Sequence, residues 1–335
     1  MSAPVLHLIK LLSDLLLSAG SVFSLLSLTS ALIISTVWLL ARRRRSGPLR
    51  WKVLARALLP HRIWSHASTR ADIGFLLLNV FATSLLIGWA LVSGSAVARY
   101  VVDGLSAVFG PSTIGLPSWL AATIMTVAAF LAYDFAYWFD HWLKHKVTFL
   151  WAFHRVHHTA EVLTPITAYR MHPVDSLIFA NICAVVIGTV EGVARFGLGG
   201  SAAAWSLDGT NLIMIAFLYT TIHLQHSHIR IAFTGWLGRL LFSPAHHHIH
   251  HSSDPKHYDC NLGSCLAVWD WMFGTLQLPD PKARLTFGAA GEEDVHSATG
   301  SLIYPFWLAL KPLVYKGVWG LRPQVFPNSI KKPAP

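Results

Sequence analysis

The sequence predicts an all-α integral membrane protein with about four to five transmembrane helices. Hydrophobic residues make up 53% of the 335 residues and charged residues only 13%, and the mean hydropathy is +0.48. A soluble domain carries about 25% charged residues. A helix of roughly 20 apolar residues crosses a hydrocarbon core about 30 Å thick, and several segments approach that length. The composition therefore excludes an ordinary soluble domain.

Five apolar segments are expected to span the membrane. They are residues 22–40, 73–92, 119–138, 177–193 and 212–222. Asp208 and Asn211 shorten the fifth segment, and Glu191 and Arg195 blunt the end of the fourth. Three weaker apolar segments are treated differently. Residues 5–17 are expected to lie on the membrane surface, with an uncleaved leader as the alternative. Residues 302–314, which contain Pro305 and Pro312, are expected to rest on the membrane, with a sixth span as the alternative, and residues 96–109 to lie in the opposite interface or to dip into the bilayer.

Basic residues concentrate in the connection between the first two expected spans, which contains no acidic residue. They are Arg42 to Arg45, Arg50, Lys52, Arg56, Arg62 and Arg70. The positive-inside rule places this connection in the cytoplasm of a bacterial inner membrane or an endoplasmic reticulum. The net charge of +10 is thereby explained by topology, and nucleic-acid binding is not expected because the aromatic interleaving and soluble scaffold of such a module are missing.

Three histidine clusters follow the third and fifth expected spans. They are His141-x-x-x-His145, His154-x-x-His157-His158 and His247-x-x-His250-His251. On a helix each spacing turns the imidazoles to one face. Because every span reverses the chain, the arginine-based topology puts all three clusters on the cytoplasmic side. With the nearby residues His172, His223 and His226 they hold too many nitrogens for one tetrahedral zinc, so two metal ions are expected.

Ligand type alone does not select the metal, because neutral imidazole suits iron, zinc and copper. The chain lacks the Cys-x-x-Cys and His-Glu-x-x-His patterns of structural and hydrolytic zinc sites. Two adjacent iron ions can bind dioxygen and oxidise an unactivated C–H bond. His226 is expected to be a ligand, whereas ligand and supporting roles stay open for His172 and His223. His246 and His248 are expected to be supporting or solvent-facing.

Ligating histidines usually donate their second ring N–H to a carboxylate or carbonyl. Four aspartates are expected to supply such acceptors: Asp134, Asp140, Asp175 and Asp270. Asp134 lies within an apolar span, where a carboxylate is costly unless it is paired. A satisfied polar contact between helices is the alternative interpretation of Asp134.

Taken together, the motifs resemble those of the sterol desaturase/fatty acid hydroxylase superfamily over about residues 121–278. They are Asp134-Phe-Ala-Tyr-Trp138, the first two histidine clusters, Arg170-Met-His172-Pro173, Gln225-His226-Ser227, Pro244-Ala-His-His247-His-Ile-His250-His251-Ser252 and Trp269-Asp-Trp-Met-Phe-Gly274-Thr275. His228 and His248 depart from residues frequent in that superfamily, and neither departure removes an expected ligand.

The resemblance implies membrane helices capped by a cytosolic histidine-rich helical unit, with two non-haem iron ions that zinc could replace in purified material. It implies as ligands His141, His145, His154, His157, His158, His226, His247, His250 and His251, with His172 as a possible further one. Three regions follow: membrane helices and basic connection at 1–116, a catalytic domain at 117–280, and a tail with an interfacial segment at 281–335.

The implied activity is the hydroxylation or desaturation of a lipid C–H bond with O2. Sterol, hopanoid, carotenoid and fatty acyl substrates all stay open. Electrons are expected from an external electron-transfer protein and its reductase, because the sequence has no dinucleotide loop after a strand and no iron–sulfur cysteine spacing. The alternative is a histidine-rich membrane metal transporter or metal sensor. A transporter would place its ligands along the spans near the bilayer midplane.

Overall fold

The computed structural model describes residues 3–42, 50–111, 114–199, 203–289 and 296–315. In these ranges the regular structure is helical except for one antiparallel hairpin of strands β1 (Ser206–Leu207) and β2 (Thr210–Asn211). The predicted all-α fold class is confirmed. Most of the arginine run at residues 42–45 and the C-terminal tail after residue 315 lie outside the described residues.

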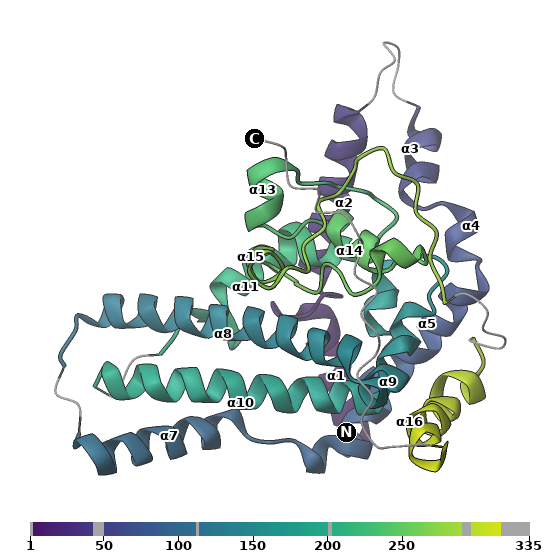
Figure 1. Cartoon of the computed structure of the whole chain (residues 1–335). Coiled ribbons are helices and arrows are strands. Elements are labelled where there is room, and N and C mark those ends of the chain that lie inside the picture. Colours follow the sequence, from purple (N-terminus) through teal and green to yellow (C-terminus); the bar gives the residue numbers. More distant parts are fainter. Residues whose placement is uncertain (1–2, 43–49, 112–113, 200–202, 290–295, 316–335) are drawn as a thin grey trace, which may run out of the picture.

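Three long helices form a layer in which α10 lies between α7 and α8 (Figure 1). Their bounds are Gly94–Phe109 for α7, Ser118–Lys146 for α8 and Pro173–Gly197 for α10. The segment Leu85–Phe109, α8 and α10 are each long and apolar enough to cross a membrane. Large side chains on this layer are exposed, with Tyr100 at 76% and Trp119 at 62%. Such an apolar surface fits contact with lipid.

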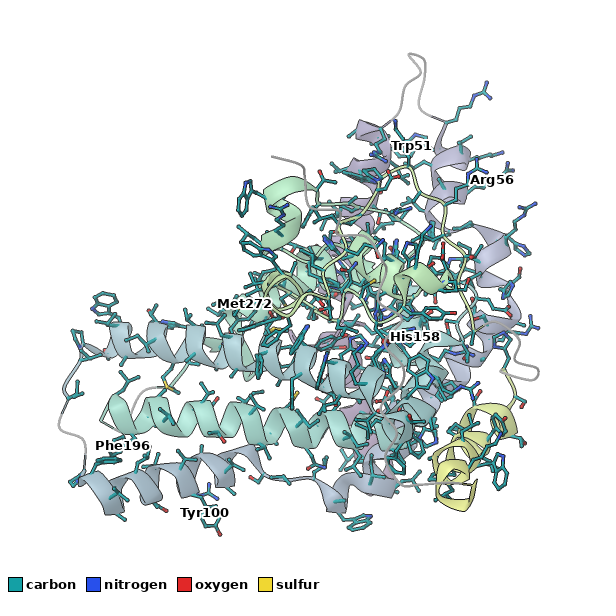
Figure 2. The ribbon with its side chains drawn as sticks, in the orientation of Figure 1. Trp51, Arg56, Tyr100, His158, Phe196 and Met272 are labelled. Carbon is teal, nitrogen blue, oxygen red and sulfur yellow. The ribbon has the colours of Figure 1, made fainter. Side chains whose placement is uncertain are left out.

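The chain before α7 forms shorter helices. They are α1 (Ala3–Leu17), α2 (Leu25–Ala41), α3 (Trp51–Leu58), α4 (His61–Trp64), α5 (Ala67–Leu78), the π-helical η1 (Asn79–Thr83), α6 (Ser84–Ile87) and the 3-10 turn η2 (Gly88–Ala90). The interfacial segment expected at 5–17 coincides with α1. Figure 2 shows Arg56 of α3 pointing away from the body of the molecule, as expected for a basic surface connection.

The remaining helices follow α8. They are α9 (Thr148–His158), η3 (Pro165–Tyr169), α11 (Leu212–Phe217), η4 (Leu218–Ile222), α12 (His223–Gln225), α13 (Gly235–Leu240), α14 (Pro244–His250), η5 (Pro255–His257), α15 (Val268–Phe273), η6 (Thr299–Ile303) and α16 (Tyr304–Tyr315). Helices α9, α11 and α15 pack against α8, and α12 packs against α14. The histidine-bearing helices are therefore assembled around the C-terminal half of α8.

The expected spans occur as three long and two short apolar helical segments. The first and fifth correspond to α2 and to Leu212–Gln225, which are shorter than the others. The second expected span, 73–92, is wrong in its bounds, because it is divided among α5, η1, α6 and η2. The side chain of Asn79 donates to the carbonyls of Tyr169 (2.9 Å) and Met171 (3.0 Å) at this π-helical turn. The long apolar segment begins at Leu85 instead and includes 96–109, which had been assigned to an interface or a shallow dip.

The C-terminal apolar segment is also more regular than expected. The two prolines do not interrupt the helical segment: η6 continues directly into α16. Pro305 is the second residue of α16, two positions after η6 ends at Ile303. Helix α16 packs against α9, with the rings of Phe306 and Phe153 centred 5.2 Å apart. Trp307 and Leu310 remain about half exposed, which suits a helix that lies on a membrane.

Two glycines allow α7 and α10 to approach closely. A Cβ atom on Gly188 would lie 2.5 Å from the carbonyl oxygen of Gly94, and one on Gly192 would lie 2.7 Å from that of Ala98. Small residues four apart are a common way of packing helices within membranes, because they let two backbones meet. These glycines position α10, whose first turn carries residues of the metal centre.

We expect Gly192→Ala to destabilise the protein by about 1–3 kcal/mol, because an overpacked helix interface must separate or shift. Thermal unfolding of the purified protein in detergent checks this. Gly197→Ala on the same helix is the matched control, since nothing lies within 4 Å of a Cβ there. Equal melting temperatures for the two variants would contradict close packing of α7 on α10.

Candidate metal centre

Nine histidines gather in two adjacent groups, and all nine are buried. The five-histidine group contains His141, His145, His154, His158 and His250. The four-histidine group contains His157, His226, His247 and His251. Within each group the ligand atoms lie within 4.8 Å of one another. The rings of His158 and His251 are centred 4.8 Å apart across the two groups, and Figure 2 shows His158 among densely packed side chains. The arrangement offers two neighbouring metal positions.

The spacing of the Nε2 atoms fits metal coordination. In the four-histidine group the Nε2 atom of His226 lies 3.0 Å from that of His157 and 2.9 Å from that of His247, which lies 3.0 Å from that of His251. Imidazoles bound to one metal at about 2.0–2.1 Å place their nitrogens about 2.9–3.4 Å apart, depending on geometry. The Nε2 atoms of His141 and His250 are buried without a hydrogen-bond partner among the described residues. Unpaired buried nitrogens are costly, so this donor set fits metal ions well.

Local helical structure orders each cluster. His141 and His145 occupy the last turns of α8, and the second cluster ends α9. The third cluster lies on α14, whose start is fixed by Pro244 and by a capping box in which Ser243 and His246 bond reciprocally. His246 and His248 are both buried, so the solvent-facing interpretation of these two residues is wrong.

Most histidines of the five-histidine group use Nδ1 for a hydrogen bond that directs Nε2 toward the metal position. His145 bonds Asp259 (3.1 Å) and His154 bonds Asp175 (3.2 Å). The main-chain carbonyls of Leu262 and Cys260 accept from His141 (2.8 Å) and His250 (3.0 Å). These bonds assign the proton to Nδ1 and leave the Nε2 lone pair for a metal.

The four-histidine group has weaker support. His157 donates through Nδ1 to the carbonyl of Arg170 (3.3 Å). The Nδ1 atoms of His247 and His251 have no hydrogen-bond partner within the part of the chain that the structure describes. No carboxylate hydrogen bond to a histidine of this group is found among the described residues.

One loop provides acceptors for three histidines of the five-histidine group. Residues 259–262 supply the Asp259 carboxylate and the Cys260 and Leu262 carbonyls. Asp259 and Asn261 both have positive φ, 58° and 55°, which Asp and Asn tolerate better than other residues with side chains. The Asn261 amide bonds the carbonyl of His246 (3.1 Å) and both main-chain groups of Gln277. The loop is therefore firmly held.

Two buried aspartates bind the chain that follows this loop. Asp270 accepts from the backbone N–H groups of Leu262 and Gly263, both at 2.8 Å, and from the side chains of Thr275 and Trp138. Asp134 of α8 accepts from the N–H groups of Cys265 (2.9 Å) and Leu266 (3.2 Å) and from the indole of Trp269 (2.9 Å). Neither bonds a histidine directly. They position the residues that do.

Of the four aspartates expected to support ligands, Asp175 alone bonds one of the nine histidines. Asp140 instead pairs with Lys144 (2.6 Å), which also pairs with Asp175. The supporting role of Asp259 could not be predicted from the sequence, because this residue lies 114 positions from His145 and forms no local pattern with it. Its carboxylate also bonds Lys146 (2.9 Å). A hydrogen-bonding residue close to the third cluster was the only available signal.

Arg170 fixes the supporting structure around His157. Its side chain is fully buried and pairs with Asp72 of α5 (2.9 Å). It also donates to the hydroxyl of Thr159 (2.8 Å) and the carbonyl of Val156 (3.0 Å). The Arg-Met-His-Pro motif therefore joins α5, α9 and the start of α10 beneath the metal centre.

Two expected ligands lie outside both groups. His172 caps α10, with Nδ1 accepting from the N–H of Val174 (3.1 Å) and Nε2 bonding the carbonyl of Leu302 (3.1 Å). His223 begins α12 and is buried, but it belongs to neither group. His226, at the end of the same helix, lies within the four-histidine group.

A cavity of about 200 Å³ opens beside the five-histidine group. Its walls include His145, His158 and His250 together with Trp151, Arg155 and Tyr258. The cavity brings a mixed polar and apolar space directly to the histidine nitrogens.

Burial keeps the imidazoles neutral. It lowers the pKa of His226 from 6.5 to about 3. Burial followed by repulsion from neighbouring imidazoles holds the pKa values of His157, His247 and His250 well below 6.5. For Asp259 burial acts upward, but hydrogen bonds and charges from His145 and Lys146 lower its pKa to about 2. The site thus combines neutral donors with an ionised carboxylate, the protonation state that metal binding requires.

Comparison with known proteins points to one family. Residues 126–275 match the family model described as fatty acid hydroxylase. The human alkylglycerol monooxygenase is 30% identical over 158 residues, covering 46% of this chain and 31% of that protein. The ornithine lipid hydroxylase of Rhizobium tropici is 26% identical (48% and 44% covered), and a Delta(7)-sterol 5(6)-desaturase of Gibberella zeae is 27% identical (49% and 45% covered).

The matched region runs from residue 126 to residue 275 and therefore contains all nine grouped histidines. The chain spans less than half the length of each of these three relatives. No solved structure is significantly similar to the chain.

We expect the metal-free protein to lose stability as the pH falls below 6.5. The histidine pKa values are lower in the folded than in the unfolded chain, so the unfolded state binds more protons in the window from 6.5 down to about 3. Each such histidine contributes about 1.4 kcal/mol per pH unit there. Thermal unfolding of chelator-treated protein on either side of 6.5 measures this, and a melting temperature that stays flat would contradict burial of neutral rings.

We expect Asp270→Ala to destabilise the protein by at least about 1–3 kcal/mol, because buried N–H donors at Leu262 and Gly263 lose their acceptor. The carbonyl of Leu262 would then orient His141 less firmly, so bound metal should also decrease. Calorimetry or fluorescence-detected unfolding, with metal analysis of the same sample, tests both effects. Asp280→Ala, at an exposed position, is the control. If Asp270→Ala unfolded and bound metal as this control does, the proposed role of the Asp270 carboxylate would be disproved.

Proposed function

Because the chain belongs to the sterol desaturase/fatty acid hydroxylase superfamily, we propose that it is a membrane-bound non-haem di-iron oxygenase. It hydroxylates or desaturates a C–H bond of a lipid, using O2 and electrons from outside the chain. The observation that carries the proposal is the convergence of nine buried imidazoles into two adjacent groups. The catalytic region is 117–280.

The nine grouped histidines would hold the iron ions, and His172 and His223 are left out of this ligand set. Neutral imidazole is a suitable ligand for iron. Bound iron would supply the dioxygen and redox chemistry that protein side chains lack. The chain contributes the orientation of each ring through Nδ1 and the dense packing that limits water around the site.

A membrane lipid is the proposed substrate class. The similar proteins are named for alkylglycerol, ornithine lipid and sterol, which have membrane-lipid character in common. Helices α8 and α10 are long and apolar enough to cross a membrane, and both reach the metal centre at one end. A carbon of the lipid could therefore reach the histidines while the rest of the lipid stays in the bilayer.

Electrons would arrive from an external protein with its reductase on the cytoplasmic side. The basic connection of residues 42–70 supports this sidedness. Arg155 lines the metal-side cavity, and Lys146 pairs with Asp259 of the loop. Positive charge there would favour an acidic electron carrier through electrostatic complementarity.

The transporter or sensor alternative is less well supported. A transporter binds its cargo near the bilayer midplane, whereas His141 and His145 occupy the end of α8. The similar proteins are named as monooxygenases, a hydroxylase and a desaturase. Both observations favour an enzyme.

We expect the iron-loaded protein to consume O2 when given reductant and an extract of membrane lipids, and to change a lipid by the mass of one oxygen or two hydrogens. Oxygen electrode and lipid mass spectrometry measure these outcomes. His247→Ala should reduce product at least about 100-fold, because removal of a buried ligand disrupts the metal site. His61→Ala, on exposed α4, should keep full activity. Metal loading without any lipid oxidation would refute the proposal.

A further inference from the structure

We infer that the two histidine groups bind metal with unequal affinity and that the five-histidine group is loaded first. The inference rests on the proposed function, since it assumes that both groups hold metal. It goes further by assigning different properties to the two positions. The two groups differ in the partners that their imidazoles contact through Nδ1, on the side of the ring away from the metal position.

Carboxylates support the five-histidine group alone among the described residues. Asp175 accepts from Nδ1 of His154 and Asp259 accepts from Nδ1 of His145. A carboxylate in this place makes the opposite ring nitrogen a stronger donor and adds negative charge near the cation. The group also offers five nitrogens against four.

Lysines fix both carboxylates in place. Lys144 is almost fully buried between Asp140 and Asp175, and Lys146 pairs with Asp259 at 2.9 Å. Asp175 shares Lys144 with Asp140 and accepts from His154, so its negative charge lies directly behind that ring. Because Asp175 and Lys144 are buried, solvent ions screen this charge much less than a surface charge. The five-histidine group therefore lies in the more negative environment.

Among the described residues, no carboxylate hydrogen bond supports the four-histidine group. His157 bonds a main-chain carbonyl, and the Nδ1 atoms of His247 and His251 are without a partner in the described part of the chain. The Arg170 carbonyl accepts this bond from His157, and the side chain of Arg170 pairs with Asp72. Rings held less firmly lose more freedom when they bind a metal, so this group should bind more weakly.

The magnitude follows from the effect of such supporting partners. Loss of one usually lowers metal affinity about 10–100-fold. Two carboxylate-supported rings in one group and none in the other should separate the two dissociation constants by at least about tenfold. Binding of two equivalents should then proceed in two resolved steps.

The test is a titration of the chelator-treated full chain in detergent with Co²⁺, followed by its visible absorption and by metal analysis. The wild type should bind one equivalent tightly and a second at least about tenfold more weakly. His250→Ala should remove the tight step, and His247→Ala should remove the weak step. These two variants assign each step to its group.

Substitutions behind the ligands test the cause. Asp259→Asn and Asp175→Asn should each weaken the tight step about 10–100-fold and leave the weak step unchanged. Glu191→Gln on α10, whose carboxylate pairs with Arg195 at the far end of the helix, should change neither. Asp259 lies on a loop and is partly exposed, so Asp259→Asn keeps the test valid if Asp175→Asn fails to fold, as judged by thermal unfolding.

Two equal steps, or a tight step that survives in His250→Ala and disappears in His247→Ala, would overturn the inference. So would Asp259→Asn binding Co²⁺ as the wild type does. None of these results would contradict the proposed activity, because that activity is tested separately by lipid oxidation. Conversely, ordered Co²⁺ binding with no oxidation of any lipid would refute the oxygenase proposal and leave the inference standing.

Discussion

The structure depends on keeping nine neutral imidazoles buried with their Nε2 atoms turned inward. An imidazole ring can rotate, and only a bond on Nδ1 fixes which nitrogen faces the metal position. Leu262, Cys260 and Asp259 provide that bond for three rings within four consecutive residues. The rest of the fold can be understood as the means of holding this short loop against α8, α9 and α14.

Buried carboxylates and the Asn261 amide hold the loop and the segment that follows it. Asp134, within the apolar sequence of α8, bonds two backbone N–H groups and an indole in the segment 265–269. Its buried charge is therefore met by three donors, which resolves the cost of a carboxylate in an apolar helix. Asp270 does the same from α15. A membrane helix and a loop more than a hundred residues away thus form one rigid support.

The parts of the site that sequence could predict are those encoded locally. His141 and His145, or His247 and His251, share a helix face because they are four residues apart. Partners such as Asp259 depend on the tertiary fold and on a positive φ, and no periodic pattern reveals them. For His172, beside Pro173, the sequence left ligand and supporting roles open, and the structure places it as the cap of a helix. The bounds of the span at 73–92 were also wrong because of a tertiary contact: the side chain of Asn79, where the helix changes, bonds a carbonyl about 90 residues away.

The length of α8 fits the proposal that the metal centre acts on a membrane lipid. Its 29 residues extend about 43 Å, whereas the hydrocarbon core is about 30 Å thick. If Trp119 lies at one boundary, the last two turns of α8 project beyond the other, and these turns carry His141 and His145. The paired Lys144, Asp140 and Asp175 lie at the same level, where α10 begins. In this placement the charged support of the five-histidine group would lie just outside the hydrocarbon, close enough for the proposed lipid substrate to reach and polar enough to solvate the proposed metal ions.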